Sequence, residues 1–261
     1  MTAGVRTSTE VLVEPVPVPS RAGYGTSLLA YAIALPVLLL LAPAVLKGES
    51  GLAAGFTWQE VADLLTPIVI LPLFALALVR GGGMDARALF AFTAIAGVWI
   101  SGQAMHLAAN AIGDATVDSG ATAYLTSVPG ELGEWLDEVL SHWVWHAGWV
   151  ALLLLLAWST LPSASVGGDS PDRTGVALVA GGLQGFTWFV VTVEGVTAVL
   201  GIPAAVVYVW LGLRTRRSPG SGRVTAAFLL ATGAVSIVGY AVWAAFNGGA
   251  LPEFSHWVAP S

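Results

Sequence analysis

Hydrophobic residues in this chain form long uninterrupted runs that are separated by short polar segments. A run of about 20 apolar residues is long enough to cross the ~30 Å hydrocarbon core of a membrane as a helix. Strands of a membrane barrel would instead alternate apolar and polar positions over segments of about ten residues. The pattern therefore predicts an all-α integral membrane protein, because helices satisfy their own backbone hydrogen bonds in lipid.

Seven membrane-spanning helices are expected. Five runs are separate crossings, at residues 27–46, 61–79, 88–112, 139–161 and 225–246. A sixth run of 39 residues, 175–213, is long enough for two crossings and a tight turn at about 1.5 Å per residue. We expect this turn at Glu194 and Gly195. Gly201 and Pro203 are a second possibility, since proline lacks the amide proton that continues a helix.

The distribution of charge indicates which side of the membrane each loop occupies. With a cytoplasmic amino terminus, nine of the 10 Lys and Arg residues lie on the cytoplasmic side, and Lys47 alone lies outside. Cytoplasmic loops usually carry such an excess of basic residues. We therefore expect a multi-pass cell-membrane protein with a mobile cytoplasmic tail (1–25), a seven-helix membrane domain (26–247) and a short outer carboxyl-terminal tail (248–261).

Composition limits the chemistry that the chain can carry. It is 56% hydrophobic and 10% charged, with a mean hydropathy of +0.79. The lack of cysteine excludes disulfides, thiolate metal sites and cysteine-held iron–sulfur clusters. Few basic residues are present and they flank the membrane spans, so no nucleic-acid partner is expected. The expected partners are the lipid bilayer and a small-molecule or lipid substrate, and the sequence leaves the oligomeric state open.

Ionisable side chains gather near the outer ends of the predicted helices. Glu138, His142 and His146 are spaced by four residues, so they share one face of a helix at about 100° per residue. His106 lies at a similar depth in the 88–112 helix, and His256 lies in the outer tail. Because such groups are costly in lipid, they form a functional-site hypothesis with the site facing the extracytoplasmic side.

Imidazole and carboxylate groups at this spacing are suited to binding a divalent metal. Catalytic zinc typically takes three protein ligands and a water molecule. Zinc is favoured over iron or manganese because iron sites in helical bundles usually carry Glu-x-x-His, which is not the spacing found here, although ligand type alone does not separate these metals. We expect His106, His142 and His146 as ligands. Glu138 is a fourth ligand or a catalytic group, and Glu194 is the expected general base. The residues expected to support these ligands are Gln103, Asn110 and Asp137.

Simpler interpretations apply to the same residues. A histidine within the membrane often hydrogen-bonds one helix to another without binding metal. Asp137 and Glu138 also suit the start of a helix, where carboxylates interact favourably with the helix dipole. Residues 131–137 are expected either to form an interfacial helix that merges into the 139–161 helix or to belong to a solvated acidic loop. Trp143 and Trp145 are expected to face lipid or neighbouring helices.

The predicted seven-helix bundle resembles one group of membrane hydrolases. The resemblance is carried by Ser101, His106, Asp137 and the His142-x-x-x-His146 pair. This group contains the alkaline ceramidases and the adiponectin-type receptors. The resemblance implies a zinc site and hydrolysis of a lipid amide. In that group the H-x-x-x-H pair lies on the last helix, whereas here it lies on the fourth, so the chain is not assigned to the group.

Three functions are compatible with this pattern. The first is a metal-dependent, hydrolase-like enzyme that acts on a lipid or amphipathic substrate. The second is a metal-ion or proton transporter or sensor, which requires a polar path to the inner side; residues 88–99 and 151–161 contain no ionisable group for such a path. The third is haem-mediated electron transfer, with His106 facing His142 or His146 as axial ligands.

Overall fold

A computed structural model describes residues 23–53, 56–161 and 171–254 of the chain, with helices and no β-strand in these ranges. Within these ranges, seven helices are long and apolar enough to cross a membrane. This confirms the all-helical fold class and the number of crossings. Most of the predicted amino-terminal tail, and His256 in the carboxyl-terminal tail, lie outside the described residues.

The helices follow one another along the chain as follows. The first crossing is built from α1 (Tyr24–Pro36), the π-helix η1 (Val37–Leu41) and α2 (Ala42–Val45), and the next two crossings are α3 (Trp58–Gly81) and α4 (Ala86–Asp118). A short turn, η2 (Thr122–Tyr124), precedes the fourth crossing, formed by α5 (Val128–Trp135), the π-helix η3 (Leu136–Ser141) and α6 (His142–Thr160). The last three are α7 (Pro171–Glu194), α8 (Ala198–Thr215) and α9 (Ser221–Phe246).

Two of the sequence predictions about boundaries are confirmed. The turn between α7 and α8 begins directly after Glu194, which is the first of the two positions considered. Helix α5 merges through η3 into α6, and together they form one helical span, while its position at the membrane interface stays a prediction. The third and fourth spans are longer than expected, since α4 continues to Asp118 and the fourth span begins at Val128.

Polar side chains at the helix starts explain several of these boundaries. The Thr57 hydroxyl accepts a hydrogen bond from the Gln59 amide at 3.2 Å, and Glu60 accepts from the Thr57 amide at 2.6 Å, which forms a capping box at α3. Ser127 accepts from the Gly130 amide at 3.3 Å at the start of α5. These side chains satisfy amide groups that have no partner inside the helix.

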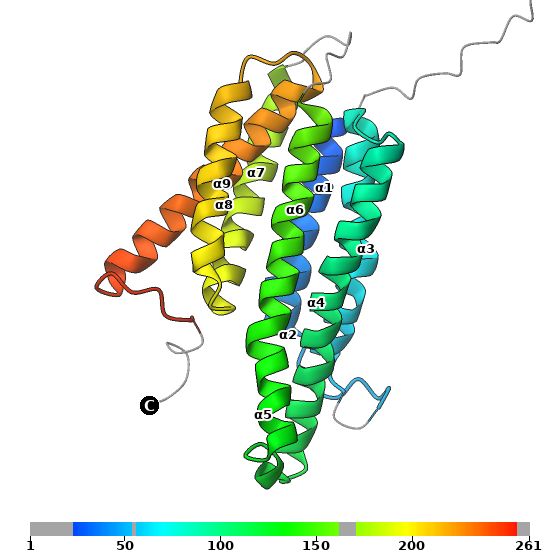
Figure 1. Ribbon diagram of the computed structural model, residues 1–261, viewed down its shortest axis with the longest axis vertical. Coiled ribbons are helices and arrows are strands. Elements are labelled where there is room, and N and C mark those ends of the chain that lie inside the picture. Colours follow the sequence, from blue (N-terminus) through cyan, green and yellow to red (C-terminus); the bar gives the residue numbers. More distant parts are fainter. Residues whose placement is uncertain (1–22, 54–55, 162–170, 255–261) are drawn as a thin grey trace, which may run out of the picture.

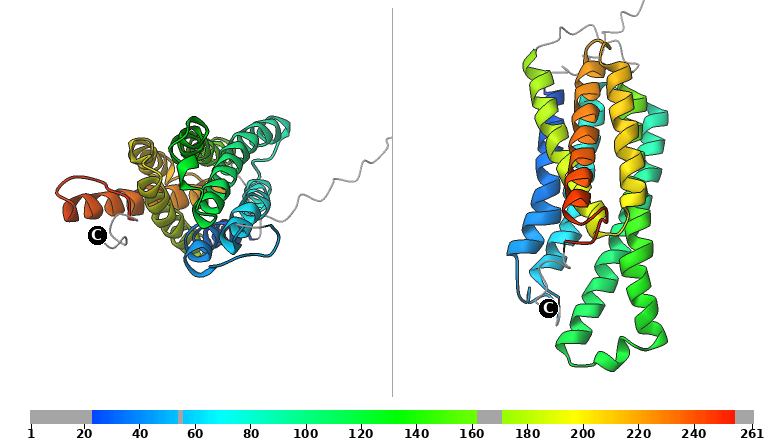
Figure 2. Two further views of the ribbon diagram at one scale, coloured as in Figure 1. Left: turned by 90° about the horizontal axis from the view of Figure 1, so that it is seen from below. Right: turned by 90° about the vertical axis from the view of Figure 1, so that its left-hand side faces the viewer.

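The crossings alternate in direction and form one bundle (Figure 1). Side-chain hydrogen bonds hold four helix ends together at one end of it: Arg80 donates to Ser27 at 2.9 Å, and the Tyr24 hydroxyl contacts Thr225 at 2.6 Å. Thr225 also contacts Thr160 at 2.7 Å. At the opposite end, α4 and the α5–α6 helix extend beyond the other helices, while α9 leans away from the bundle (Figure 2). Which end faces the cytoplasm stays a prediction from charge.

Large apolar side chains fill the centre of the bundle and also cover its outside. Trp149 and Trp188 are buried, and the Trp149 indole donates to the Tyr31 hydroxyl at 3.0 Å. Phe90 is 78% exposed and Val199 is 67% exposed, as expected for side chains that face lipid. The largest fully buried side chains, which form this core, are Trp99, Trp149, Trp188, Tyr31, Tyr208, Phe74 and Phe228.

Candidate functional site

A close contact between α4 and α6 creates the region in which the histidines lie. A Cβ atom added at Gly102 of α4 would be 2.4 Å from the backbone nitrogen of Trp145 and 2.8 Å from the Ser141 carbonyl oxygen. Only glycine permits this approach of the two backbones, as is common between membrane helices. His106 follows one turn after Gly102, so the contact brings it against the start of α6.

The three histidines predicted as ligands lie beside one another. The ring centres of His106 and His142 are 5.1 Å apart, and those of His142 and His146 are 5.8 Å apart. Trp145 is 6% exposed and packs against them, since its ring is stacked on His106 at 6.2 Å and lies 4.9 Å from His146. We call His106, His142, His146 and Trp145 the histidine region. Trp143, by contrast, is 41% exposed.

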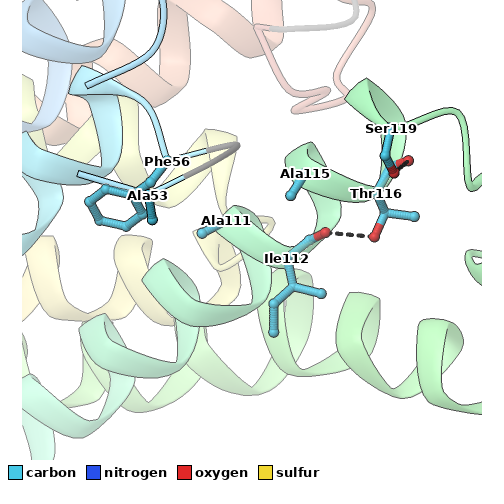
Figure 3. A pocket seen from close by; sticks show the side chains of 7 residues that line it. All are labelled: Ala53, Phe56, Ala111, Ile112, Ala115, Thr116 and Ser119. Carbon is cyan, nitrogen blue, oxygen red and sulfur yellow. Dashed lines mark hydrogen bonds between the residues drawn. The ribbon is translucent and has the colours of Figure 1, made fainter. Parts of the chain in front are cut away.

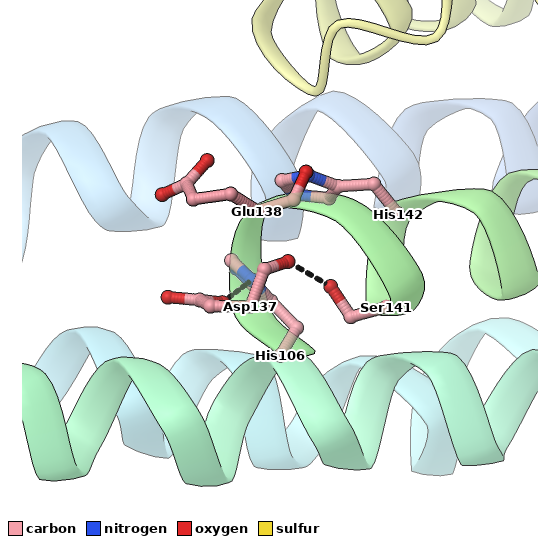
Figure 4. Close-up of polar contacts among 5 residues, drawn as sticks. All are labelled: His106, Asp137, Glu138, Ser141 and His142. Atoms are coloured by element: carbon pink, nitrogen blue, oxygen red, sulfur yellow. Dashed lines mark hydrogen bonds and ion pairs between the residues drawn. The ribbon is translucent and has the colours of Figure 1, made fainter. Parts of the chain in front are cut away.

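Each of the three imidazoles uses Nδ1 for a hydrogen bond. Nδ1 of His106 is 2.6 Å from Oδ1 of Asp137 (Figure 4), and Nδ1 of His142 is 3.1 Å from the Glu138 carbonyl oxygen. Because an ionised carboxylate and a carbonyl only accept, both Nδ1 atoms donate. Nδ1 of His146 is 2.6 Å from the hydroxyl of Thr197. In a neutral ring with a protonated Nδ1, the lone pair is on Nε2, which is therefore the atom left to bind a ligand.

Asp137 lies beside His106, as expected of a supporting residue, whereas Glu138 does not lie where a ligand was expected. Asp137 is buried and contacts His106, whereas Glu138 is exposed, and its carboxylate points away from the His142 ring (Figure 4). Both residues lie in the π-helix η3, where hydrogen bonds between residues i and i+5 widen the turn. The Glu138 side chain leaves this turn on its exposed side, so the four-residue spacing does not bring its carboxylate to the His142 ring. Ser141 closes the turn by donating to the Asp137 carbonyl.

Two of the supporting residues expected from sequence, Gln103 and Asn110, lie on α4. Gln103 is 2% exposed, and neither polar atom of its amide has a hydrogen-bond partner among the described residues. Asn110 is half-buried, one turn beyond His106. Ser101, which contributed to the resemblance with membrane hydrolases, is exposed and donates to the Gly97 carbonyl of its own helix at 2.8 Å.

Glu194 lies at the end of α7 and holds the carboxyl-terminal segment. Its Oε2 accepts a hydrogen bond from the backbone amide of Phe254 at 2.8 Å. The carboxylate therefore has a structural partner, and its predicted role as a general base stays untested.

Several buried polar atoms in and beside the histidine region have no hydrogen-bond partner within the described part of the chain. They are Nε2 of His146, Nε1 of Trp145 and both polar atoms of the Gln103 amide. Buried polar groups are normally paired, with protein or with ordered water. This region is therefore suited to a polar occupant. As placed, no three or more His, Asp or Glu side chains of the described residues form a metal-binding group.

Two residues beside the histidine region were not identified from sequence. Asp63 of α3 lies close enough to His106 and Asp137 to interact with them electrostatically. An acidic residue inside a predicted membrane helix was the signal that could have identified it. Thr197 had no such signal, because a threonine near a turn is common.

A separate pocket of about 360 Å³ lies near the carboxyl-terminal end of α4 (Figure 3). Around α4, Ala111 and Ala115 project about 140° and 180° away from His106, at about 100° per residue. The pocket therefore lies on the opposite face of α4 and is not part of the histidine region. Its lining residues are Ala53, Phe56, Ala111, Ile112, Ala115, Thr116 and Ser119.

Comparison of the chain with protein families, with curated proteins and with solved structures finds no match. The functional argument therefore depends on the site alone.

Proposed function

We propose that this protein is a metal-dependent membrane enzyme of the hydrolase type, with a divalent metal bound by His106, His142 and His146. The observation that carries the proposal is the use of Nδ1 by all three histidines. A hydrogen bond from the second ring nitrogen to a carboxylate, carbonyl or hydroxyl group is the usual support of a metal-binding histidine. Here those partners are Asp137, the Glu138 carbonyl and Thr197.

Ring spacing supports a tetrahedral ion such as zinc. Zinc–nitrogen bonds of about 2.0–2.1 Å in a tetrahedral arrangement place two imidazole ring centres about 5 Å apart. His106 and His142 have this spacing, at 5.1 Å. Axial ligands on opposite sides of a haem iron would need more than about 6 Å by the same bond lengths, which disfavours the haem alternative. The rings of His142 and His146 are parallel within 9°, so binding all three requires these rings to turn.

Carboxylates next to the histidines suit acid–base chemistry. Glu138 is exposed at the edge of the region, and Asp63 approaches His106 from α3. A zinc ion held by these histidines would supply an activated water for hydrolysis. We assign Glu138 the role of proton acceptor. We assign Asp63 the role of offsetting, with its negative charge, the positive charge of a bound metal. A lipid or amphipathic molecule is the expected substrate, since the region lies among helices whose outer faces carry exposed apolar side chains.

One observation favours transport as a second candidate. Gln184 of α7 and Tyr208 of α8 are fully buried, and their side-chain polar atoms have no hydrogen-bond partner in the described ranges. Gln184 is ten residues before Glu194, which places it about 15 Å deeper along the helix. Polar groups at that depth are what a proton or ion path across the bundle would require.

Elemental analysis of the purified protein tests the proposal directly. We expect one zinc per chain in wild type, and loss of the metal in His106→Ala and His142→Ala. Glu131→Gln, on the exposed surface of α5, is the control and should keep the metal. Wild type without stoichiometric metal would remove the proposal. An absorption spectrum with a Soret band would instead support haem.

Uptake measurements distinguish the enzyme from the transporter. Purified protein is reconstituted in sealed vesicles, and zinc and proton fluxes are recorded for wild type, Glu138→Gln and Gln184→Leu. The proposed enzyme gives no flux above that of empty vesicles. A flux that both substitutions abolish would establish transport as the function.

A further inference from the structure

The turn between α7 and α8 is packed directly on two of the histidine rings. A Cβ atom added at Gly195 would lie 3.0 Å from Cγ of His142 and 3.0 Å from Cε1 of His146. The next residue, Val196, has φ 52° and is 62% exposed. A β-branched residue in this left-handed conformation is uncommon and strained, and such strain persists where the surrounding structure holds it.

Backbone hydrogen bonds hold the strained turn in place. The Gly195 amide donates to the Val191 carbonyl at 2.9 Å, and the Thr197 amide donates to the Thr192 carbonyl at 2.9 Å. Thr197 follows the strained Val196 in this turn, is fully buried and lies beside His146.

The partners of Thr197 indicate which nitrogen of His146 carries the proton. The Thr197 hydroxyl lies 2.6 Å from Nδ1 of His146 and is directed toward the Thr192 carbonyl oxygen at 3.4 Å. When the hydroxyl donates its single proton toward that carbonyl, it accepts from Nδ1 of His146. In this arrangement the lone pair of His146 is on Nε2, the buried atom that has no hydrogen-bond partner among the described residues.

We propose that Thr197 is a positioning residue, which selects the Nδ1-protonated tautomer of His146 and orients its Nε2 lone pair toward the occupant of the histidine region. The proposal rests on the proposed function only for the identity of that occupant, a divalent metal. Thr197 does not contact the metal, and it acts through His146.

Two substitutions at Thr197 separate the hydroxyl from the volume of the side chain. Thr197→Val removes the hydroxyl at nearly constant volume, and Thr197→Ser retains it. Thr66→Val is the matched control, because Thr66 is also fully buried and its hydroxyl donates at 2.9 Å to the Ala62 carbonyl, within its own helix.

The first readout is the tautomer of His146 in metal-free protein. It is measured from ¹⁵N chemical shifts of histidine-labelled protein at a pH where imidazole is neutral, and the signal is assigned by its loss in His146→Gln. We expect the Nδ1-protonated form in wild type, Thr197→Ser and Thr66→Val, and a mixture or the Nε2-protonated form in Thr197→Val. An unchanged tautomer in Thr197→Val overturns the proposal.

The second readout is zinc affinity by competition with a chromogenic chelator. Loss of a hydrogen-bonding partner behind a metal ligand typically weakens binding by about 10- to 100-fold, which we expect for Thr197→Val and not for Thr197→Ser. Equal zinc affinity of wild type and Thr197→Val overturns the positioning role. If wild type binds no zinc while Thr197→Val alters the tautomer, the proposed function fails and the hydrogen-bond assignment stands.

Discussion

Substitution of Asp137 by Asn tests which carboxylate supports the histidine region. Asp137 Oδ1 lies 2.6 Å from Nδ1 of His106, and the two side chains are 13% and 23% exposed. Asn has nearly the same shape but lacks the charge, and its amide presents either a weaker acceptor or a donor to Nδ1. Removal of such a partner typically lowers metal affinity by about 10- to 100-fold. At about 1.4 kcal/mol per tenfold change, the loss in binding free energy is about 1.4–2.8 kcal/mol.

Zinc competition titrations of wild type, Asp137→Asn and Glu138→Gln measure this difference. Because the Glu138 carboxylate is exposed and points away from the His142 ring, we expect Glu138→Gln to bind zinc within about threefold of wild type, well below the loss that follows removal of a partner behind a ligand. A circular dichroism melt of each variant checks that the fold is retained. The reasoning is refuted if Glu138→Gln loses the metal and Asp137→Asn retains it, since that result would make Glu138 the carboxylate that supports the site.

Three further predictions concern stability. Gly102→Ala should lower the melting midpoint by several degrees and release bound metal, because its Cβ would meet the Trp145 backbone at 2.4 Å. The control is Gly113→Ala on the same helix, where nothing lies within 4 Å of an added Cβ. It should leave the midpoint unchanged or raise it in the same thermal melt. Tyr24→Phe should lower the free energy of unfolding by about 1 kcal/mol in a denaturant titration, since it removes the buried hydrogen bond to Thr225. No change would show that the hydrogen bond between the Thr225 and Thr160 hydroxyls is sufficient without Tyr24. Val196→Gly should raise the melting midpoint, because glycine relieves a backbone strain of about 1–3 kcal/mol and the exposed valine side chain contributes little packing. A lower midpoint would contradict the strain at this turn.

The crossings and their order could be predicted from sequence because the membrane imposes a length and a polarity on each helix. The 39-residue run 175–213 had to contain two crossings, and the turn after Glu194 follows from its midpoint. The candidate histidines could also be named, since a polar side chain in an apolar run is conspicuous. Depth and helical phase were sufficient to place His106 near the start of α6.

Local hydrogen bonding inside the bundle could not be predicted in the same way. Periodicity assumes a regular helix, and the π-helix η3 breaks that regularity between Trp135 and His142. Helical phase placed the Glu138 carboxylate with the histidines, but the structure turns it away from His142 and brings only Asp137 into contact with His106. Nothing in the hydrophobic pattern distinguishes a π turn from an α turn, because the two differ in backbone hydrogen bonding and not in residue type.

What the sequence by itself determined is thus an all-helical, seven-crossing chain with histidines at one depth, because burial in lipid depends on composition along each helix. Only the tertiary structure decided which atoms meet. The contact of Gly102 with Trp145 sets the spacing of α4 and α6, and the strained turn at Val196 brings Thr197 to His146. Both depend on approaches between segments that are far apart in the chain, and such approaches are fixed by packing in three dimensions rather than by any local pattern of residues.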